Sequence, residues 1–222
     1  MCGRFTIKTD PMLLAERFGI ALPDGLEPRY NVAPSQDVLA ITHARGAPAA
    51  RLLRWGLVPH WAKDQRIGFK MINARAETVA VKPAYRTLVA EHRCLIVADG
   101  FYEWRIDPDG AKRPVRFTLA SDEAFAFAGL SAFWRDPEAG TLLESCTIIT
   151  TTANEIVAPV HDRMPVILPR LDEGRWLDPR VASDEALALL KPLAVELMAA
   201  RDASTLVNSA RNDAPELLDP LG

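Results

Sequence analysis

The sequence has no apolar run that approaches the roughly 20 residues needed to cross a membrane as a helix. Its first residues also lack the charged head and long apolar stretch of a signal peptide. There are only three cysteines, Cys2, Cys94 and Cys146, and neither this odd number nor their spacing fits a disulfide framework or a zinc site. We therefore expect a soluble, cytosolic protein with reduced thiols.

Repeats, low-complexity tracts and flexible linkers are missing too. The 222 residues are 49% hydrophobic and 25% charged, which excludes disordered, collagen-like and coiled-coil chains. A chain of this length buries about 70% of its unfolded surface when it folds. We expect one globular domain over residues 1–222.

The net charge of -3 argues mildly against a nucleic-acid partner, but the charges are unevenly spread. Residues 1–94 carry 14 Lys and Arg against 8 Asp and Glu, a net charge of +6, and residues 95–222 carry a net charge of -9. The basic half is suited to an anionic partner. An uneven distribution of ordinary surface charges explains the numbers equally well.

Strands are predicted where β-branched and aromatic residues concentrate, at 38–42, 51–55, 94–98, 115–119, 124–130 and 146–150. A helix is predicted after Asp10, since Asp10 can cap it, Pro11 suits its first turn and Gly19 suits its end. The fold class is therefore α+β, with a curved, mostly antiparallel β-sheet or barrel-like core flanked by helices.

Three further helical segments are expected. Thr152 and Glu155 have capping-box spacing, which predicts a short helix there. Residues 172–177 and 183–200 have helical patterns, and Pro192 should break or kink the second. Between all these elements lie segments that mix aromatic, charged and amide residues, as binding loops on a rigid scaffold do: 29–34, 55–61, 71–78, 99–104 and 159–165.

Cys2 is the first candidate for chemistry. Removal of Met1 would leave a residue with a free α-amine and a thiol, and such an aminothiol condenses with an aldehyde to an imine that sulfur closes to a thiazolidine. The amine has an ordinary pKa of about 7.7 to 8.0, so part of it is neutral in the cytosol. Alternatively the thiol attacks a carbonyl as a hydrolytic nucleophile, or Cys2 is simply a small residue at this position. Gly3 permits close approach of a ligand, and Arg4 would pair with an anion such as phosphate, or form an ordinary salt bridge.

Asn73, Arg75 and Glu77 would share one face of an extended strand. Such a face binds a ligand or is simply solvated. Glu103 stands between Tyr102 and Trp104, and we expect partial desolvation to raise its pKa and suit it to proton transfer. An exposed Glu on an edge strand is the alternative.

His161 lies between two prolines and could act as a general acid or base, with Arg163 holding a phosphate, although a lone His is more often structural. The other three histidines form no pair at ligand spacing, so we predict no metal and no cofactor. Trp55 and Trp61 could stack on bases, or belong to the core.

Six segments in this order resemble the SOS-response-associated peptidase family, also described as abasic-site processing proteins. They are MCGRF at 1–5, RYNVAP at 29–34, RWGLVP at 54–59, INARAET at 72–78, DGFYEW at 99–104 and VHDRMP at 160–165. The resemblance runs from the first residue to about residue 180. It implies a sensor of abasic sites in single-stranded DNA, as at stalled replication forks, that crosslinks itself to them and acts at the nucleoid during the SOS response.

The resemblance also implies the roles of individual residues. Cys2 would form the thiazolidine with the ring-opened deoxyribose, Asn73 would position the sugar, Glu103 would manage protons in this lyase-like imine chemistry, and His161 would assist ring opening. Arg4, Arg75 and Arg163 would hold phosphates, and Pro34 and Trp61 would wedge or stack the strand. Lys82 and Arg86 are further phosphate contacts by position only.

Two alternatives remain at this point. One is a cysteine peptidase with Cys2 as nucleophile and His161 and Glu103 in support. The other is a non-covalent single-stranded DNA-binding module in which Cys2 is incidental. Capture of a single strand requires only a monomer, which is the state we expect.

Overall fold

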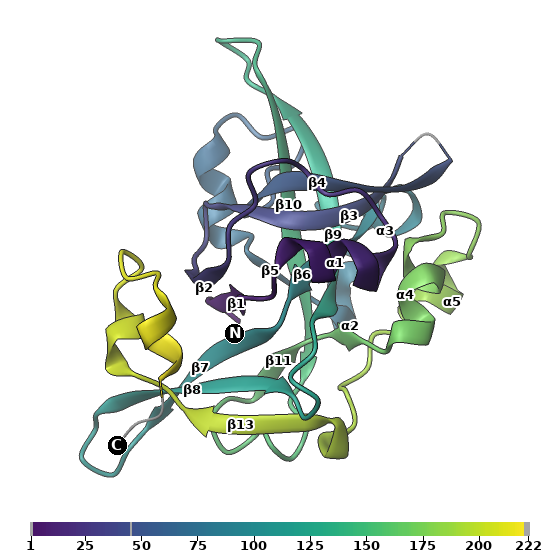
Figure 1. Cartoon of the computed structure of the whole chain (residues 1–222). Coiled ribbons are helices and arrows are strands. Elements are labelled where there is room, and N and C mark those ends of the chain that lie inside the picture. Colours follow the sequence, from purple (N-terminus) through teal and green to yellow (C-terminus); the bar gives the residue numbers. More distant parts are fainter. Residues whose placement is uncertain (1, 45, 220–222) are drawn as a thin grey trace.

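The computed structural model describes residues 2–44 and 46–219, and its strands form two sheets (Figure 1). The smaller sheet is five-stranded and antiparallel. Its strand order is β13 (Met198–Asp202), β8 (Lys112–Leu119), β7 (Gly100–Ile106), β1 (Phe5–Ile7) and β2 (Arg29–Val32). The start of the chain therefore lies inside a sheet, between two strands that come later in the sequence.

The larger sheet closes on itself. Its path runs through β11 (Arg163–Pro165), β10 (Leu142–Thr152), β4 (Ala47–Trp55), β3 (Asp37–Ala44), β6 (Arg93–Ala98), β9 (Phe125–Arg135) and β12 (Ile167–Leu168). Pairing of β9 with β10 joins β10, β4, β3, β6 and β9 into a ring. Only β4 and the short β5 (Asn73–Arg75) pair with β10 in parallel. The predicted barrel-like, mostly antiparallel core is confirmed, and each of the six predicted strands lies within or overlaps an observed one.

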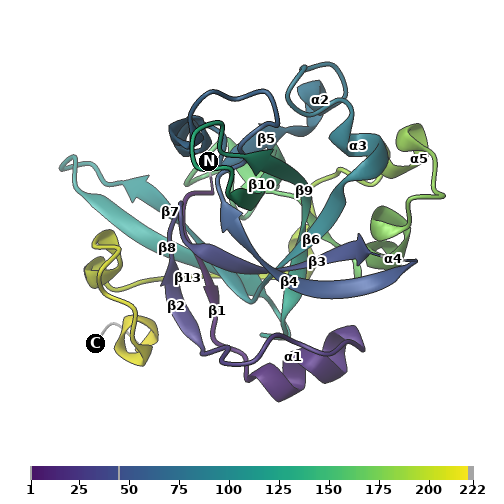
Figure 2. The same cartoon turned by 90° about the horizontal axis from the view of Figure 1, so that it is seen from above.

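Short helices flank these sheets. In α1 (Pro11–Phe18) the Asp10 side chain accepts a hydrogen bond from the Met12 amide, and Gly19 ends the helix with a left-handed φ of 64°, as predicted. The other helices are α2 (Ala76–Val79), α3 (Leu88–Glu91), α4 (Arg170–Leu177) and α5 (Ser183–Leu187), with 3-10 turns η1 (Gln65–Lys70), η2 (Val195–Leu197), η3 (Thr205–Asn208) and η4 (Pro215–Leu218). Figure 2 shows α4 and α5 on the side of the molecule opposite the C-terminal segment.

Successive side chains of a strand point to opposite faces of the sheet and so belong to two different large clusters of the core. In β3, Val38 and Ala40 join a cluster with residues of both sheets, whereas Leu39 and Ile41 face the larger cluster under the helices. In the first cluster the ring centroids of Phe5 and Trp55 lie 5.1 Å apart. Strand β1 is therefore anchored by aromatic packing as well as by its ladder.

The segment 54–59 contains a glycine that the packing requires. Gly56 has a φ of 126°, and a Cβ on it would lie 2.8 Å from the carbonyl oxygen of Gly68. A side chain at either position would collide with the other main chain. This contact holds η1, which follows Trp61, against the end of β4.

Two helix predictions are wrong. Thr152 is the last residue of β10, and residues 155–160 form turns in which the Asn154 side chain, and not Thr152, accepts the Val157 amide. The predicted helix 183–200 stops at Leu187 in α5, and residues 198–202 form β13 on the edge of the smaller sheet. Pro192, which lacks the amide hydrogen that a helix needs, lies between the end of α5 and the start of β13.

Four of the five segments expected to be binding loops are more regular than predicted, because β2, β5, β7 and β11 lie in or overlap them. In the fifth, residues 56–61 form a loop after β4, as predicted. The mixture of polar and aromatic residues in the other four reflects strands with one face in the core and one in a polar site.

Candidate functional site

The site is built around the residues that precede β1. Phe5 pairs with Phe101 of β7, and the Tyr102 amide donates a 2.9 Å hydrogen bond to the carbonyl of Arg4. The antiparallel register carries residues 2–4 along β7 toward Glu103. The same hydrogen-bond ladder that forms the sheet therefore brings Cys2 and Glu103 together.

Cys2 is fully buried, with an exposed fraction of 0%. Burial raises the pKa of its thiol well above the ordinary value, and the negative charge of Glu103 raises it further. The thiol is therefore neutral at physiological pH. All three cysteines are free and buried, as the prediction of reduced thiols requires.

Asn73 reaches the site from the larger sheet. Its strand β5 pairs in parallel with β10, where Asn73 lies opposite Ile148. The Asn73 Nδ2 donates a 2.8 Å hydrogen bond to the carbonyl oxygen of Cys2. Its Oδ1 is buried and makes no hydrogen bond to the described residues, so it can accept one from a ligand.

Glu103 lies in β7 and is only 4% exposed. Burial raises the pKa of its carboxyl, and the charge of His161 acts in the opposite direction. The expected desolvation between Tyr102 and Trp104 is confirmed. A carboxyl with a raised pKa is suited to exchange protons near neutral pH.

His161 stands in the turn between β10 and β11. Its Nδ1 accepts a 2.9 Å hydrogen bond from the Arg163 amide and also lies 2.9 Å from Oδ1 of Asp162. The first contact requires an unprotonated Nδ1 and the second favours a protonated one. The His161 side chain is 30% exposed, and its charge acts on the buried carboxyl of Glu103.

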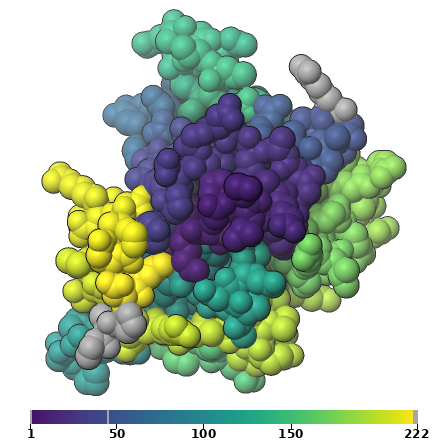
Figure 3. Space-filling view, in the orientation of Figure 1, coloured from purple at the N-terminus to yellow at the C-terminus, as the bar shows by residue number. Residues whose placement is uncertain are grey.

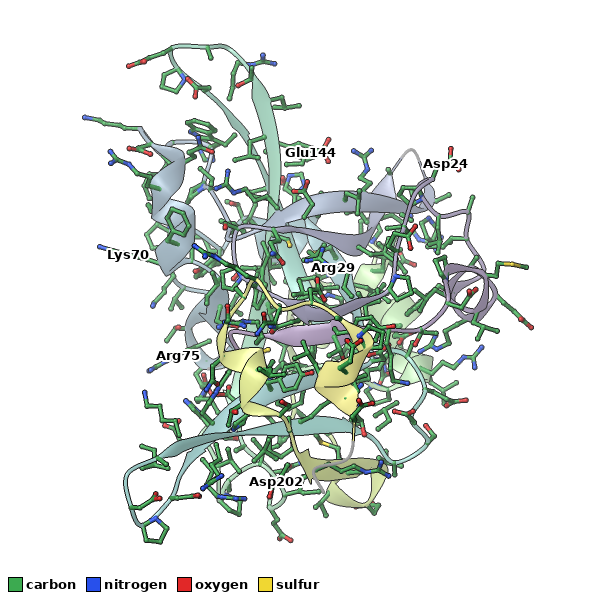
Figure 4. All side chains as sticks on the ribbon, turned by 60° about the vertical axis from the view of Figure 1, so that its left-hand side comes forward. Asp24, Arg29, Lys70, Arg75, Glu144 and Asp202 are labelled. Atoms are coloured by element: carbon green, nitrogen blue, oxygen red, sulfur yellow. The ribbon has the colours of Figure 1, made fainter. Side chains whose placement is uncertain are left out.

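The three arginines have different surroundings. Arg163 donates two hydrogen bonds to the Glu77 carboxylate, at 2.7 and 2.9 Å, and a third to the carbonyl of Thr150. Arg75 is exposed, and Figure 4 shows it on the same edge of the molecule as Lys70. Arg4 donates from Nη1 to Asn31 and Val207, and burial lowers its pKa.

One strand-face prediction is wrong. Asn73 and Arg75 are both in β5, but the extended stretch ends at Arg75, and Glu77 lies in α2. Glu77 therefore turns to Arg163 instead of sharing a face with Asn73. This ion pair ties α2 to β11.

The residues expected to stack on bases, and those expected to contact phosphates by position alone, have different surroundings. Trp61 is 52% exposed and borders a cavity of about 240 Å³ together with Pro59 and Phe133. Trp55 is fully buried in the core and donates its Nε1 hydrogen to the carbonyl of Ile72, so its possible stacking on bases is wrong. Pro34 is half-buried after β2, and Lys82 and Arg86 are exposed between α2 and α3.

Asp99 is a residue that sequence reasoning missed. Its buried carboxylate accepts hydrogen bonds from the Thr6 hydroxyl at 2.6 Å and from the amides of Lys8 and Thr9 at 2.6 and 2.8 Å. Arg116 supplies a further donor at 3.3 Å. Asp99 thus fixes the chain directly after β1. Its place at the end of an apolar strand, before Gly100, is the signal that could have found it.

Among the residues that the structure describes, no group of three or more His, Cys, Asp or Glu side chains is arranged to hold a metal ion. In the same part of the chain, no helix is long and apolar enough to cross a membrane.

These features define a class of protein in which a cysteine near the chain start is held beside a buried carboxyl whose pKa responds to a histidine. The chain belongs to the SOS response associated peptidase (SRAP) family, because the model of this family matches residues 1–210. The expected resemblance is confirmed.

Relatives and solved structures agree with this assignment. The Bacillus subtilis protein named "Abasic site processing protein YoqW" is 49% identical over 224 residues, covering 99% of both chains. The chicken protein named "Abasic site processing protein HMCES" is 38% identical over 76% of this chain and 56% of its own. The crystal structure of a Bacteroides thetaiotaomicron protein superimposes with a TM-score of 0.90 and 26% identity, covering 99% of this chain and 100% of the other.

Proposed function

We propose that this protein processes abasic sites in DNA by forming a covalent thiazolidine crosslink between Cys2, freed of Met1, and the ring-opened abasic deoxyribose in a single strand. The proposal is carried by the convergence of Asn73 and Glu103 on Cys2. The names of the relatives support the abasic-site part of it. The crosslink would shield the lesion during the DNA damage response.

The reaction balances without a co-reactant. The α-amine of Cys2 adds to the sugar aldehyde carbon, and loss of one water gives the imine. The Sγ then adds to the same carbon while the thiol proton moves to the imine nitrogen, so a five-membered ring closes. Ring closure removes the iminium that drives strand cleavage by β-elimination.

The side chains around Cys2 suit these steps. Asn73 fixes the main chain of Cys2 with Nδ2, and its buried Oδ1 accepts a hydrogen bond from the sugar. Glu103 takes a proton from the amine adduct and returns it to the departing water, and it then passes the thiol proton to the imine nitrogen, which its raised pKa permits. His161, whose side chain is 30% exposed, assists opening of the sugar ring and relays protons.

Phosphate contacts would supply the affinity in this proposal, with no need for base readout. Arg4, Arg75 and Arg163 hold the phosphates next to the lesion, with Lys82 and Arg86 further along the strand. Pro34 and Trp61 wedge or stack the bases. The protein acts as a monomer in the cytoplasm, on the nucleoid.

A peptidase with Cys2 as nucleophile is the second candidate, because the family description contains that word. The neutral, buried thiol favours the aldehyde reaction over it. A thiol peptidase attacks with a thiolate, whereas in the aldehyde reaction the amine attacks first and the thiol loses its proton only after the imine has formed.

The test uses a single-stranded oligonucleotide with one abasic site and protein confirmed by mass to lack Met1. We expect a heat-stable adduct on a denaturing gel, with the mass of protein plus DNA minus one water. Cys2→Ala should give no thiazolidine, whereas the matched variant Cys94→Ala, which also removes a buried thiol, should react normally. Absence of any adduct would overturn the proposal and leave the peptidase or a non-covalent DNA-binding module.

A further inference from the structure

The segment 203–219 covers the outer face of the smaller sheet. It consists of turns, with η3 and η4 as its only regular pieces among the described residues. Val207 is fully buried and packs with Ala203 against Tyr102 of β7. In Figures 1 and 3 the yellow segment lies on one flank of the molecule, against residues from the start of the chain. None of the six motifs that resemble the SRAP family lies in this segment.

Asn31 connects this segment to the site. It is fully buried in β2, and its Oδ1 accepts a 2.8 Å hydrogen bond from Nη1 of Arg4. Its Nδ2 faces the main-chain carbonyls of Val207, Ser209 and Asn212 at 3.2, 3.0 and 2.7 Å. The side chain of Asn31 therefore contacts the main chain of residues 207–212 through Nδ2 and orients Arg4 through Oδ1.

Asp213 fixes the same segment to β2. Its carboxylate accepts hydrogen bonds from the amides of Tyr30, at 2.5 Å, and Asn31, at 3.0 Å, and forms an ion pair with Arg29. Figure 4 shows Arg29 beside the C-terminal segment. Strand β2 is at the edge of the sheet, so these contacts occupy donors that would otherwise be unpaired.

The contacts of Arg4 leave its charge uncompensated. Nη1 donates to an amide oxygen of Asn31 and, at 2.8 Å, to the carbonyl of Val207, and both acceptors are uncharged. Nε makes no hydrogen bond to the described residues. The guanidinium also lies 5.9 Å from the ring centroid of Trp104, whose Nε1 donates to Asn208 of the same segment. An arginine that is held by neutral acceptors can still form an ion pair with a phosphate.

We infer that residues 203–219 position Arg4 for a DNA phosphate, and that Asn31 and Asp213 are the positioning residues through which they act. This inference rests on the proposed function. It assigns the segment to phosphate binding and not to the chemistry at Cys2.

The experiment measures binding to a single-stranded oligonucleotide carrying a tetrahydrofuran abasic analogue, which has no aldehyde and cannot crosslink. We expect Asn31→Ala to bind about fivefold more weakly at 0.1 M salt, with a salt slope about 0.7 smaller, as for loss of one phosphate contact on a single strand. Arg4→Ala should give the same result. The double variant should be no weaker than Arg4→Ala alone, because both changes remove one interaction.

A second pair of variants keeps the test decisive if Asn31→Ala does not fold. Asp213→Asn should reproduce the smaller salt slope, and Asn31→Asp should weaken binding more than Asn31→Ala, because a carboxylate beside Arg4 neutralises it. Glu173→Ala is the matched control: it breaks the bidentate pair with Arg17 between α4 and α1, so it lowers stability without touching Arg4.

The outcomes separate this inference from the proposed function. The inference is overturned if Asn31→Ala and Asp213→Asn have the wild-type salt slope of binding. It is also overturned if the affinity losses of Asn31→Ala and Arg4→Ala multiply in the double variant. Neither result affects crosslinking by the wild type. Lack of crosslinking by the wild type overturns the proposed function, and the salt slopes still report whether Asn31 positions Arg4.

Discussion

The side-chain amide of Asn73 donates a 2.8 Å hydrogen bond to the main-chain carbonyl of Cys2. Asn73 belongs to the larger sheet and Cys2 precedes β1 of the smaller one, so this bond joins the two sheets at Cys2. It restrains the carbonyl next to the α-carbon, which carries the nitrogen of Cys2 directly and its thiol through Cβ. The position of the amine and thiol therefore depends on a side chain from another sheet.

Asn73→Ala should slow crosslinking at saturating DNA by about 10- to 100-fold, since misplacement of reacting groups by about 1 Å has effects of that size. Single-turnover gel assays with protein lacking Met1 measure this rate. Asn73→Asp keeps the shape but removes the Nδ2 donor, and we expect it to be slow as well. A wild-type rate for Asn73→Asp would contradict the positioning role of Nδ2.

Glu103→Gln should slow crosslinking by about 10²-fold or more at pH 8, because it removes the proposed acid and base. The informative quantity is the ratio of the wild-type rate to the variant rate after each is divided by its own fraction of neutral amine, since the charge of Glu103 also acts on the amine. That ratio should fall as the pH is lowered through the raised pKa of Glu103, where the carboxylate becomes protonated. A ratio that stays constant from pH 8 to pH 4.5 would show that ionised Glu103 is not the base.

The same substitution should stabilise the fold at high pH. Burial raises the pKa of Glu103 above its ordinary 4.5, so folding favours the protonated form, and ionisation above the raised pKa reduces stability. The free energy of unfolding of Glu103→Gln should exceed that of the wild type at pH 8, and the gain should shrink as the pH falls to 4.5. Urea denaturation measures it, and the exposed Glu138→Gln should show no such trend.

Arg75 and Arg163 are both proposed to hold phosphates, but they should differ in what they contribute to stability. Arg75 is exposed, so Arg75→Ala should leave stability within about 0.5 kcal/mol and weaken single-strand binding about fivefold at 0.1 M salt. Arg163→Ala breaks the pair with Glu77 and the bond to Thr150, and we expect a loss of about 1 to 3 kcal/mol in unfolding free energy. Equal stability losses for the two variants would contradict this reading of their surroundings.

Arg93 should be the most sensitive arginine for folding. Its buried guanidinium donates to the main-chain carbonyls of Trp176, Val89, Asp178 and Val181, at 2.5 to 3.0 Å, which ties α3 and α4 to β6. Arg93→Ala leaves these acceptors unpaired and should cost about 3 kcal/mol or more. The exposed Arg135→Ala, which loses one bond to the Gly140 carbonyl, should change stability by no more than about 0.5 kcal/mol.

The strands and the first helix were predictable because their signals are local. The β-branched and apolar residues at 38–42 and the caps Asp10 and Gly19 require no knowledge of the rest of the chain. β13 was missed because Met198–Asp202 becomes a strand only by pairing with β8. Tertiary pairing there overrides a helical pattern that Pro192 had already weakened.

The site was predictable to a different extent. The desolvation of Glu103 followed from its aromatic neighbours, and Cys2 stood out by its chemistry. The hydrogen bond from Asn73 to Cys2 joins residues 71 positions apart, and that from Arg4 to Asn31 joins residues 27 apart. Contacts of this range depend on sheet order and register, which composition and spacing do not contain. Asn31 and Asp213 were missed for that reason.

Val207, an acceptor of Arg4, lies 203 residues after it in the chain and is therefore synthesised much later. At about 5 to 20 residues per second, the ribosome needs about 10 to 40 s to synthesise the chain between them. During that interval the basic side chain lacks the acceptors that orient it, and β1 lacks its neighbour β7 until residue 106 has been made. A nascent chain therefore carries Cys2 before the side chain of Arg4 is oriented, and that orientation is complete only when residues 203–219 have folded onto the smaller sheet.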